Sequence, residues 1–153
     1  MEQRLLGKTG LTVSAVGFGC GAIGGLMVKG DPAAQRRAVA RAIEAGFLYF
    51  DTAPSYGNGR SEENLGRVLS ELHADVIVGT KVRVDDGDLS DVPAAIKRSL
   101  ETSLRRLRRD RVNLLQLHNR IGGSDGLPID TLLGPVFDGV LAVREAGLTE
   151  HIG

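Results

Sequence analysis

The sequence predicts an α/β protein built on a parallel β-sheet. Short aliphatic or β-branched runs at residues 15–19, 47–50, 76–80 and 112–117 have the character of buried strands, and amphipathic stretches separate them. The strand-plus-helix unit recurs roughly every 30 to 40 residues, as βα units do. Four such units and a hairpin amount to about half of a (β/α)8 barrel, which typically has ~250 residues.

The chain opens with a predicted β-hairpin. Residues 4–14, RLLGKTGLTVS, place the turn residues Gly-Lys-Thr-Gly between two short extended segments. Helices with apolar residues at helical spacing are then expected after each of the first three strands. Pro32 stands where a first helical turn tolerates proline. The N-cap candidates are Asp31 for the first helix, Ser61 for the second, and Ser90 or Asp91 for the third.

The C-terminal part continues the alternation. A fourth helix is expected over about 135–146 with Gly147 as its C-cap, and Ile152 is expected to begin another strand. No low-complexity segment or interdomain linker is evident, so residues 1–153 are interpreted as one incomplete domain without an internal boundary. An open parallel sheet leaves two edges unpaired, which predicts self-association of an isolated half-barrel.

Composition excludes several classes of function. Lys plus Arg and Asp plus Glu number 19 each, so no net field favours nucleic acid or an anionic membrane. The basic run at 105–111, RRLRRDR, falls at a helix C-terminus and is interpreted as solvated surface. The single Cys20 allows no internal disulfide and no CxxC or Cys/His metal pattern. No signal peptide or apolar run of ~20 residues is present, so a cytoplasmic protein acting on small molecules is expected.

A dinucleotide-binding module is an alternative interpretation. Gly19, Gly21 and Gly24 fit GxGxxG after a predicted strand, and Asp51 ends the next strand, where that fold places its ribose-binding acid. In that fold the glycine turn opens directly into a helix, whereas the first helix is expected here only after Pro32. The motif therefore lacks its usual context.

Polar side chains end three consecutive predicted strands. Asp51 ends the second strand, Lys81 the third and His118 the fourth, while Tyr56 lies in the turn just after Asp51. The C-terminal ends of parallel strands open on one edge, and three neighbouring ends span only ~10 Å. These four side chains are therefore expected to form one cluster.

The four residue types suit protonation of a carbonyl oxygen. A free tyrosine has a pKa of about 10, so a tyrosine acid or base needs help near neutrality. The ammonium of Lys81 would favour a phenolate, since unit charges ~4 Å apart attract by about 4 kcal/mol at an effective dielectric of about 20. Asp51 would compensate that ammonium, and a neutral His118 could position a substrate oxygen. No side chain supplies a hydride, so a nicotinamide cofactor is implied.

Three segments resemble the N-terminal signature regions of the aldo-keto reductases. They are GFLYFDTAPSYGNGRSEENLG at 46–66, VGTKV at 78–82 and VNLLQLHN at 112–119, in the order and at the separations of that family. The resemblance implies a (β/α)8 barrel and NAD(P)H-dependent interconversion of an aldehyde or ketone and its alcohol, with a small carbonyl or sugar-like substrate. It also implies that Tyr56 is the general acid/base, that Lys81 and Asp51 support it, and that His118 orients the carbonyl.

The same resemblance bears on the cofactor. NADPH is the usual cofactor of the family, with NADH as the alternative. Gly19, Cys20, Gly21 and Asp51 correspond to neighbours of the cofactor. Members of the family are about twice as long, and most of their cofactor contacts come from the second half. The 153-residue chain alone is therefore expected to bind cofactor incompletely and to lack activity, unless two copies pair as a half-barrel dimer.

Overall fold

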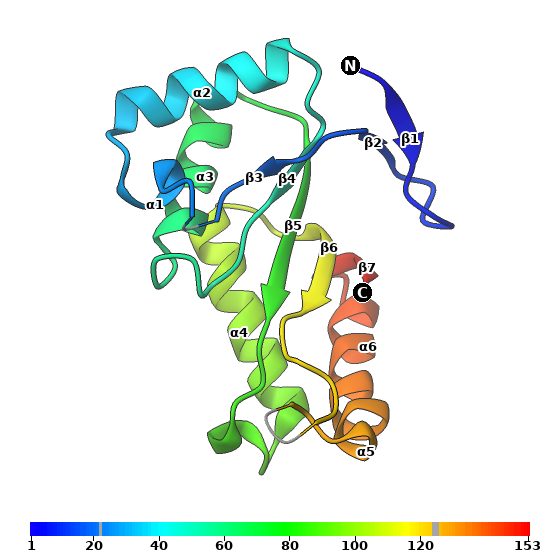
Figure 1. The fold of residues 1–153 in the computed structure, drawn as a ribbon. Helices are drawn as coiled ribbons and strands as arrows, with labels where there is room; N and C mark the ends of the chain where they lie inside the picture. Colours follow the sequence, from blue (N-terminus) through cyan, green and yellow to red (C-terminus); the bar gives the residue numbers. More distant parts are fainter. Residues whose placement is uncertain (22, 124–125) are drawn as a thin grey trace.

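A parallel β-sheet of five strands, arranged in the order of the chain, forms the centre of the fold (Figure 1). The structure is a computed structural model, and it describes residues 1–21, 23–123 and 126–153. The strands are β3 (Phe18–Gly19), β4 (Tyr49–Asp51), β5 (Ile77–Val82), β6 (Val112–Leu117) and β7 (Thr149–Ile152). The predicted parallel sheet is confirmed. The expectation that Ile152 begins a strand is wrong, because Ile152 is the last residue of β7. The polar residues Glu150 and His151 hide this strand from a search for apolar runs.

The predicted N-terminal hairpin is also present. It consists of β1 (Gln3–Leu5) and β2 (Thr12–Ser14), which pair antiparallel with Gln3 opposite Ser14. The Ser14 hydroxyl donates to the Val16 carbonyl at 2.7 Å and accepts from the Leu48 amide at 2.9 Å. The hairpin is thereby tied to the segment that enters β4.

Four main helices alternate with the strands and lie in a row in which each contacts the next. They are α2 (Pro32–Glu44), α3 (Arg60–Glu71), α4 (Val92–Leu107) and α6 (Phe137–Glu145). Shorter helical segments are α1 (Leu26–Lys29), η1 (Asp86–Asp88), α5 (Ile129–Thr131) and the π-helical turn η2 (Leu132–Val136). In Figure 1 the arrows of β5 and β6 point toward the end of the molecule where α5 lies.

Two of the predicted helix starts are confirmed and one is wrong. The Asp31 carboxylate accepts from the Ala33 and Ala34 amides at 3.0 Å, and Asp91 caps α4 in the same way. Ser61 is not an N-cap, because the left-handed Gly59 (φ 90) starts α3 and leaves Ser61 buried in its first turn. The expectation that no helix precedes Pro32 is also wrong, since α1 is a single turn before it.

The last helix begins later than predicted but ends as expected. Pro135 lies inside η2, where Gly134 has non-helical angles, so regular α-helix starts only at Phe137. At its end Gly147 has φ 75, its amide bonds the Arg144 carbonyl at 2.9 Å, and the Leu148 amide bonds the Val143 carbonyl at 3.0 Å. This pair of bonds is a Schellman C-cap.

The apolar core lies between the sheet and the helices. Phe50, Val78 and Leu115, from the three central strands, have no exposed surface or almost none. Their partners on the helices include Val39, Leu65, Val68, Ile96, Leu100 and Val143. Because side chains alternate along a strand, the neighbouring positions Asp51 and Lys81 face the opposite side. Among the described helices, none combines the length and apolar character needed to cross a bilayer.

Candidate active site

The predicted strand ends meet at one edge of the sheet. Asp51 is the last residue of β4, Lys81 is the next to last of β5, and His118 follows β6 directly. The His118 amide donates to the Val82 carbonyl at 2.8 Å, which extends the β5–β6 ladder by one step. Parallel pairing therefore brings these three positions together, although up to 67 residues separate them along the chain.

Lys81 and Asp51 form a largely sheltered ion pair. Lys81 Nζ donates to Asp51 Oδ2 at 2.7 Å and to the Thr52 carbonyl at 2.8 Å. The side chains of Lys81 and Asp51 are only 12% and 28% exposed. An ammonium this sheltered needs an anion, and the carboxylate at the end of β4 supplies it.

Tyr56 completes the group of four. Lys81 Nζ lies 4.9 Å from the centre of the Tyr56 ring, within the range of a cation–π contact. The His118 ring meets Tyr56 edge to face, with 5.9 Å between the ring centres. The four predicted residues are thus linked by successive contacts, from Asp51 to Lys81, from Lys81 to Tyr56 and from Tyr56 to His118. We call these four residues the strand-end cluster.

The loop that carries Tyr56 depends on its glycines. Gly57 has φ 64, and a Cβ there would lie 2.4 Å from Val28 Cγ1 in α1. Behind the loop, the buried Ser61 hydroxyl donates to the Cys20 carbonyl at 2.9 Å and contacts the Thr52 hydroxyl at 2.8 Å. The turn after β4 is therefore packed against α1 and fastened to the end of β3.

His118 is biased toward its neutral form. Burial is the largest cause that lowers its pKa, and the positive charges of Lys81 and Arg83 lower it further. The charge of Asp51 acts in the opposite direction but does not dominate. A neutral imidazole retains one N–H donor and one acceptor nitrogen.

Tyr49 is a second phenol at the site, and the sequence reasoning missed it. Its hydroxyl donates to Asp51 Oδ1 at 3.2 Å. Burial is the first cause that raises the pKa of Tyr49, followed by the charge of Asp51 and this hydrogen bond. Tyr49 and Tyr56 are the two tyrosines of the chain, and Tyr49 keeps its proton strongly. The signal available in the sequence was the spacing of two residues between Tyr49 and Asp51, which puts both on one face of a strand.

The predicted cofactor neighbours run beside the cluster. Gly19 pairs with Asp51 across β3 and β4, and the Cys20 amide donates to the Asp51 carbonyl at 2.8 Å. A Cβ on Gly21 would lie 3.8 Å from the Tyr56 ring. Cys20 is buried, which is the main reason that its thiol pKa is raised to about 12. In the GxGxxG segment, Ala22 lies outside the described residues.

A buried ion pair behind the sheet was also missed. Glu62 has no exposed surface, and it accepts from the Thr80 hydroxyl at 2.7 Å and from the Arg106 guanidinium at 3.1 Å. The interpretation of the basic run as solvated surface is therefore wrong for Arg106, although it holds for the exposed Arg105 and Arg108. The pair joins α3, α4 and the strand that carries Lys81.

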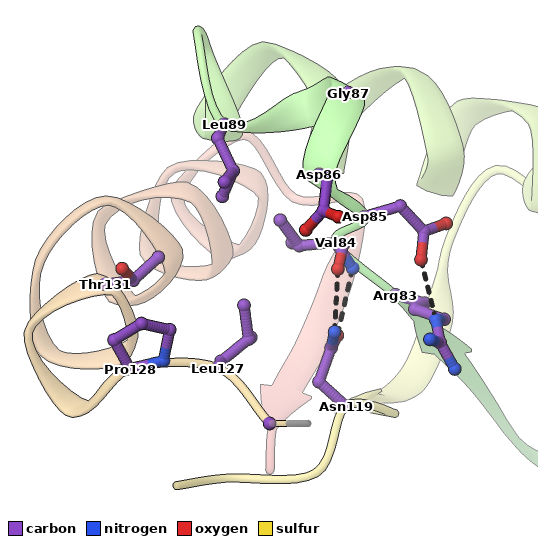
Figure 2. Close-up of a pocket in the computed structure, with 11 residues that line it drawn as sticks. Arg83, Val84, Asp85, Asp86, Gly87, Leu89, Asn119, Leu127, Pro128 and Thr131 are labelled. Carbon is purple, nitrogen blue, oxygen red and sulfur yellow. Dashed lines mark hydrogen bonds and ion pairs between the residues drawn. The ribbon is translucent and has the colours of Figure 1, made fainter. Parts of the chain in front are cut away.

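A separate hollow of about 620 Å³ lies between the loop after β5 and the segment that leads into α5 (Figure 2). Asn119 spans its wall, since its side-chain amide donates to the Val84 carbonyl at 2.7 Å and its oxygen accepts from the Val84 amide at 2.9 Å. Arg83 pairs with Asp85 at 2.7 Å on the same wall. The cluster residues are not among the described residues that line this hollow.

Comparisons with known proteins agree on one family. Residues 15–153 match the model of the Aldo/keto reductase family. L-galactose dehydrogenase of Arabidopsis thaliana is 37% identical over 161 aligned positions, which cover 100% of this chain and 48% of that enzyme. The chain thus spans about half the length of the curated relatives it matches.

Solved structures give the same result. The holo form of an aldo-keto reductase from Bacillus halodurans superposes with a TM-score of 0.78 at 31% identity, covering 100% of this chain and 50% of that one. An aldo-keto reductase from Klebsiella pneumoniae in complex with NADPH has a TM-score of 0.73 at 28% identity, covering 94% and 46%. The five parallel strands and their helices correspond to part of a (β/α)8 barrel.

Proposed function

Because this chain belongs to the aldo-keto reductase family, we propose that its strand-end cluster serves the NADPH-dependent interconversion of an aldehyde or ketone and its alcohol. One observation carries the proposal. The Lys81 ammonium bonds the Asp51 carboxylate at 2.7 Å and lies 4.9 Å from the centre of the Tyr56 ring. A phenol beside a held cation is equipped to give up and regain a proton.

Tyr56 is the proposed general acid of the reduction. It gives its hydroxyl proton to the carbonyl oxygen, which becomes the alcohol oxygen, and the phenol becomes a phenolate. The Lys81 ammonium beside the ring supplies the positive charge that stabilises that phenolate. In the oxidation direction the phenolate takes the proton back from the alcohol.

Asp51 and His118 have supporting roles. Asp51 and the Thr52 carbonyl hold the Lys81 ammonium at 2.7 and 2.8 Å, so the ammonium does not have to be ordered during the reaction. His118 contacts the Tyr56 ring edge to face and is biased toward neutrality. Its N–H is the proposed donor that orients the carbonyl oxygen toward Tyr56.

The residues beside the cluster fit a nicotinamide. Gly21 presents no side chain against the Tyr56 ring, and Gly19 is paired directly with Asp51, so backbone rather than side chains borders this side of the site. We assign Gly19, Cys20, Gly21 and Asp51 as neighbours of the cofactor. When bound, the nicotinamide supplies the hydride that the carbonyl carbon receives. The NADPH complex of the Klebsiella pneumoniae relative supports NADPH, with NADH as the alternative.

The proposed substrate is a small carbonyl compound, with sugar-like aldehydes as the first class to test. Similarity to an L-galactose dehydrogenase supports this choice. A non-catalytic dinucleotide-binding module is less well supported, because dinucleotide binding alone does not explain why Tyr56 contacts Lys81 and His118.

NADPH titration of the purified chain, followed by aldehyde-dependent oxidation of NADPH, tests the proposal. Because the chain spans about half of its relatives, activity is expected from the paired half-barrel, so sedimentation of the same sample reports whether two copies associate. From that dimer we expect saturable binding at roughly micromolar NADPH and oxidation that depends on added aldehyde. The matched control is Lys97→Met, because Lys97 is an exposed lysine of α4 away from the cluster. NADPH binding without oxidation, across aldehydes, ketones and aldoses, would contradict the carbonyl chemistry. Absence of NADPH binding would contradict the cofactor assignment.

A further inference from the structure

Tyr49 and Lys81 bind opposite oxygens of one carboxylate. The Tyr49 hydroxyl donates to Asp51 Oδ1 at 3.2 Å, and Lys81 Nζ donates to Asp51 Oδ2 at 2.7 Å. One donor is a neutral phenol and the other is a cation. Because both oxygens are engaged, the carboxylate cannot rotate about its Cβ–Cγ bond without losing at least one hydrogen bond.

Two glycines make room for the Tyr49 ring. A Cβ on Gly17, just before β3, would lie 2.9 Å from Tyr49 Cδ1, and a Cβ on Gly79 in β5 would lie 2.5 Å from the Tyr49 hydroxyl oxygen. Neither glycine has a positive φ, so space rather than backbone conformation explains them. The two neighbouring strands therefore form a slot shaped for this phenol.

Tyr49 is suited to donate a hydrogen bond without losing its proton. It is half-buried, and burial together with the adjacent Asp51 charge raises its pKa. The phenol consequently remains protonated through neutral and moderately alkaline pH. Such a group can hold a carboxylate but cannot readily act as the acid of the reaction.

We propose that Tyr49 is a positioning residue, which fixes the Asp51 carboxylate and thereby holds the Lys81 ammonium against the Tyr56 ring. This inference rests on the proposed function, since that function makes the location of Lys81 important for Tyr56. Tyr49 acts through Asp51.

The test removes the Tyr49 hydroxyl alone. Tyr49→Phe keeps the ring in its slot, and nitrogen-15 NMR of the lysine ammonium groups reports how firmly Lys81 is held. The chain has four lysines, and Lys81→Met assigns the signal of interest. We expect proton exchange of the Lys81 ammonium with water to accelerate about fivefold in Tyr49→Phe, the factor that corresponds to one ordinary hydrogen bond. An unchanged exchange rate would overturn the proposal.

A second variant approaches the same contact from the other side. Gly79→Ala crowds the Tyr49 hydroxyl oxygen and, at 3.1 Å, the ring carbons Cε2 and Cζ, so it should accelerate the same exchange. It should add little to that exchange once Tyr49 is Phe, because the hydroxyl contact with Asp51 is then already lost. Gly87→Ala is the matched control, because a Cβ there would meet nothing within 4 Å, and it should change nothing. If Gly79→Ala accelerated the exchange equally with and without the Tyr49 hydroxyl, the effect would not run through that hydroxyl, which would contradict the proposal.

Turnover gives an independent result. Tyr49→Phe should lower kcat about fivefold while the KM for NADPH stays unchanged, whereas general loosening of the fold would change both. If the unmodified chain pairs as a dimer but shows no turnover, the proposed function fails. The ammonium exchange measurement then still decides whether Tyr49 positions Asp51 and Lys81.

Discussion

The Lys81 ammonium lies 4.9 Å from the centre of the Tyr56 ring, on the side of the sheet away from the helices. Lys81 belongs to β5 and Tyr56 to the loop after β4, so sheet pairing and loop packing together set this separation. In the proposed function this cation stabilises the phenolate that forms when Tyr56 gives up its proton.

Removing the Lys81 cation should slow proton transfer without weakening NADPH binding. Lys81→Met should lower kcat by about 10² or more, the usual scale of a lost general acid–base contribution. NADPH affinity should change little, because the Lys81 ammonium donates its hydrogen bonds to Asp51 and to the Thr52 carbonyl. Steady-state kinetics with a parallel NADPH titration measures both quantities. Equal losses in kcat and NADPH affinity would show that Lys81 binds cofactor instead.

The imidazole of His118 should titrate below the ordinary histidine pKa of about 6.5. Burial and the nearby charges of Lys81 and Arg83 lower its pKa, so the folded state binds this proton less readily than the unfolded state. The resulting stability is present above about pH 6.5 and is lost as the pH falls through the lowered pKa. Proton NMR of the three histidines, with His118→Gln for assignment, measures the midpoint.

The Lys81→Met variant is a control for the His118 titration. Because the ammonium is one cause of the lowering, Lys81→Met should move the His118 midpoint upward. A midpoint above about 6.5 in the unmodified chain would contradict the assignment of His118 as a neutral donor.

The single thiol should be inert in the folded chain. Burial raises the pKa of Cys20 to about 12, so about one thiol in 10⁴ is ionised at pH 8. Alkylation by iodoacetamide should therefore be at least about 100-fold slower than in the chain unfolded by guanidinium. Mass spectrometry of timed samples follows the reaction. Equally fast modification in both states would show that the turn around Cys20 is open.

The ion pair behind the sheet should matter for stability. Arg106→Met leaves the fully buried Glu62 carboxylate without its cation, and we expect the free energy of unfolding to fall by about 3 kcal/mol. Urea unfolding measures this change. Arg98→Met, at an exposed position of the same helix, should stay within about 0.5 kcal/mol of the unmodified chain.

A double variant separates the charge from the packing. Glu62→Gln combined with Arg106→Met should be more stable than Arg106→Met alone, because no unpaired charge remains buried. A double variant that is less stable than the single one would assign the effect to lost packing of the arginine stem.

The strand-end cluster could be predicted because it follows from local rules. Strand direction and side-chain alternation place Asp51, Lys81 and His118 on one edge, whichever helices cover the sheet. The loop of Tyr56 is short, so it could only fold back over that edge. The N-caps Asp31 and Asp91 were likewise local signals, since their partners lie within three residues.

The features that were missed depend on distant parts of the chain. The Tyr49 slot requires Gly79, on a neighbouring strand, to stand beside it. Arg106 meets Glu62 across 44 residues, so nothing local in the basic run distinguishes this arginine from its solvated neighbours. The true start of α3 depends on the positive φ of Gly59, which competes with the N-cap signal of Ser61.

The most direct test of the central claim is the turnover of Tyr56→Phe, measured beside Tyr49→Phe as the matched tyrosine substitution. If Tyr56 is the general acid, the kcat of Tyr56→Phe should fall by about 10² or more while NADPH binding is kept. The kcat of Tyr49→Phe should fall only about fivefold. Unchanged reduction of the aldehyde by Tyr56→Phe would show that another group protonates the carbonyl oxygen.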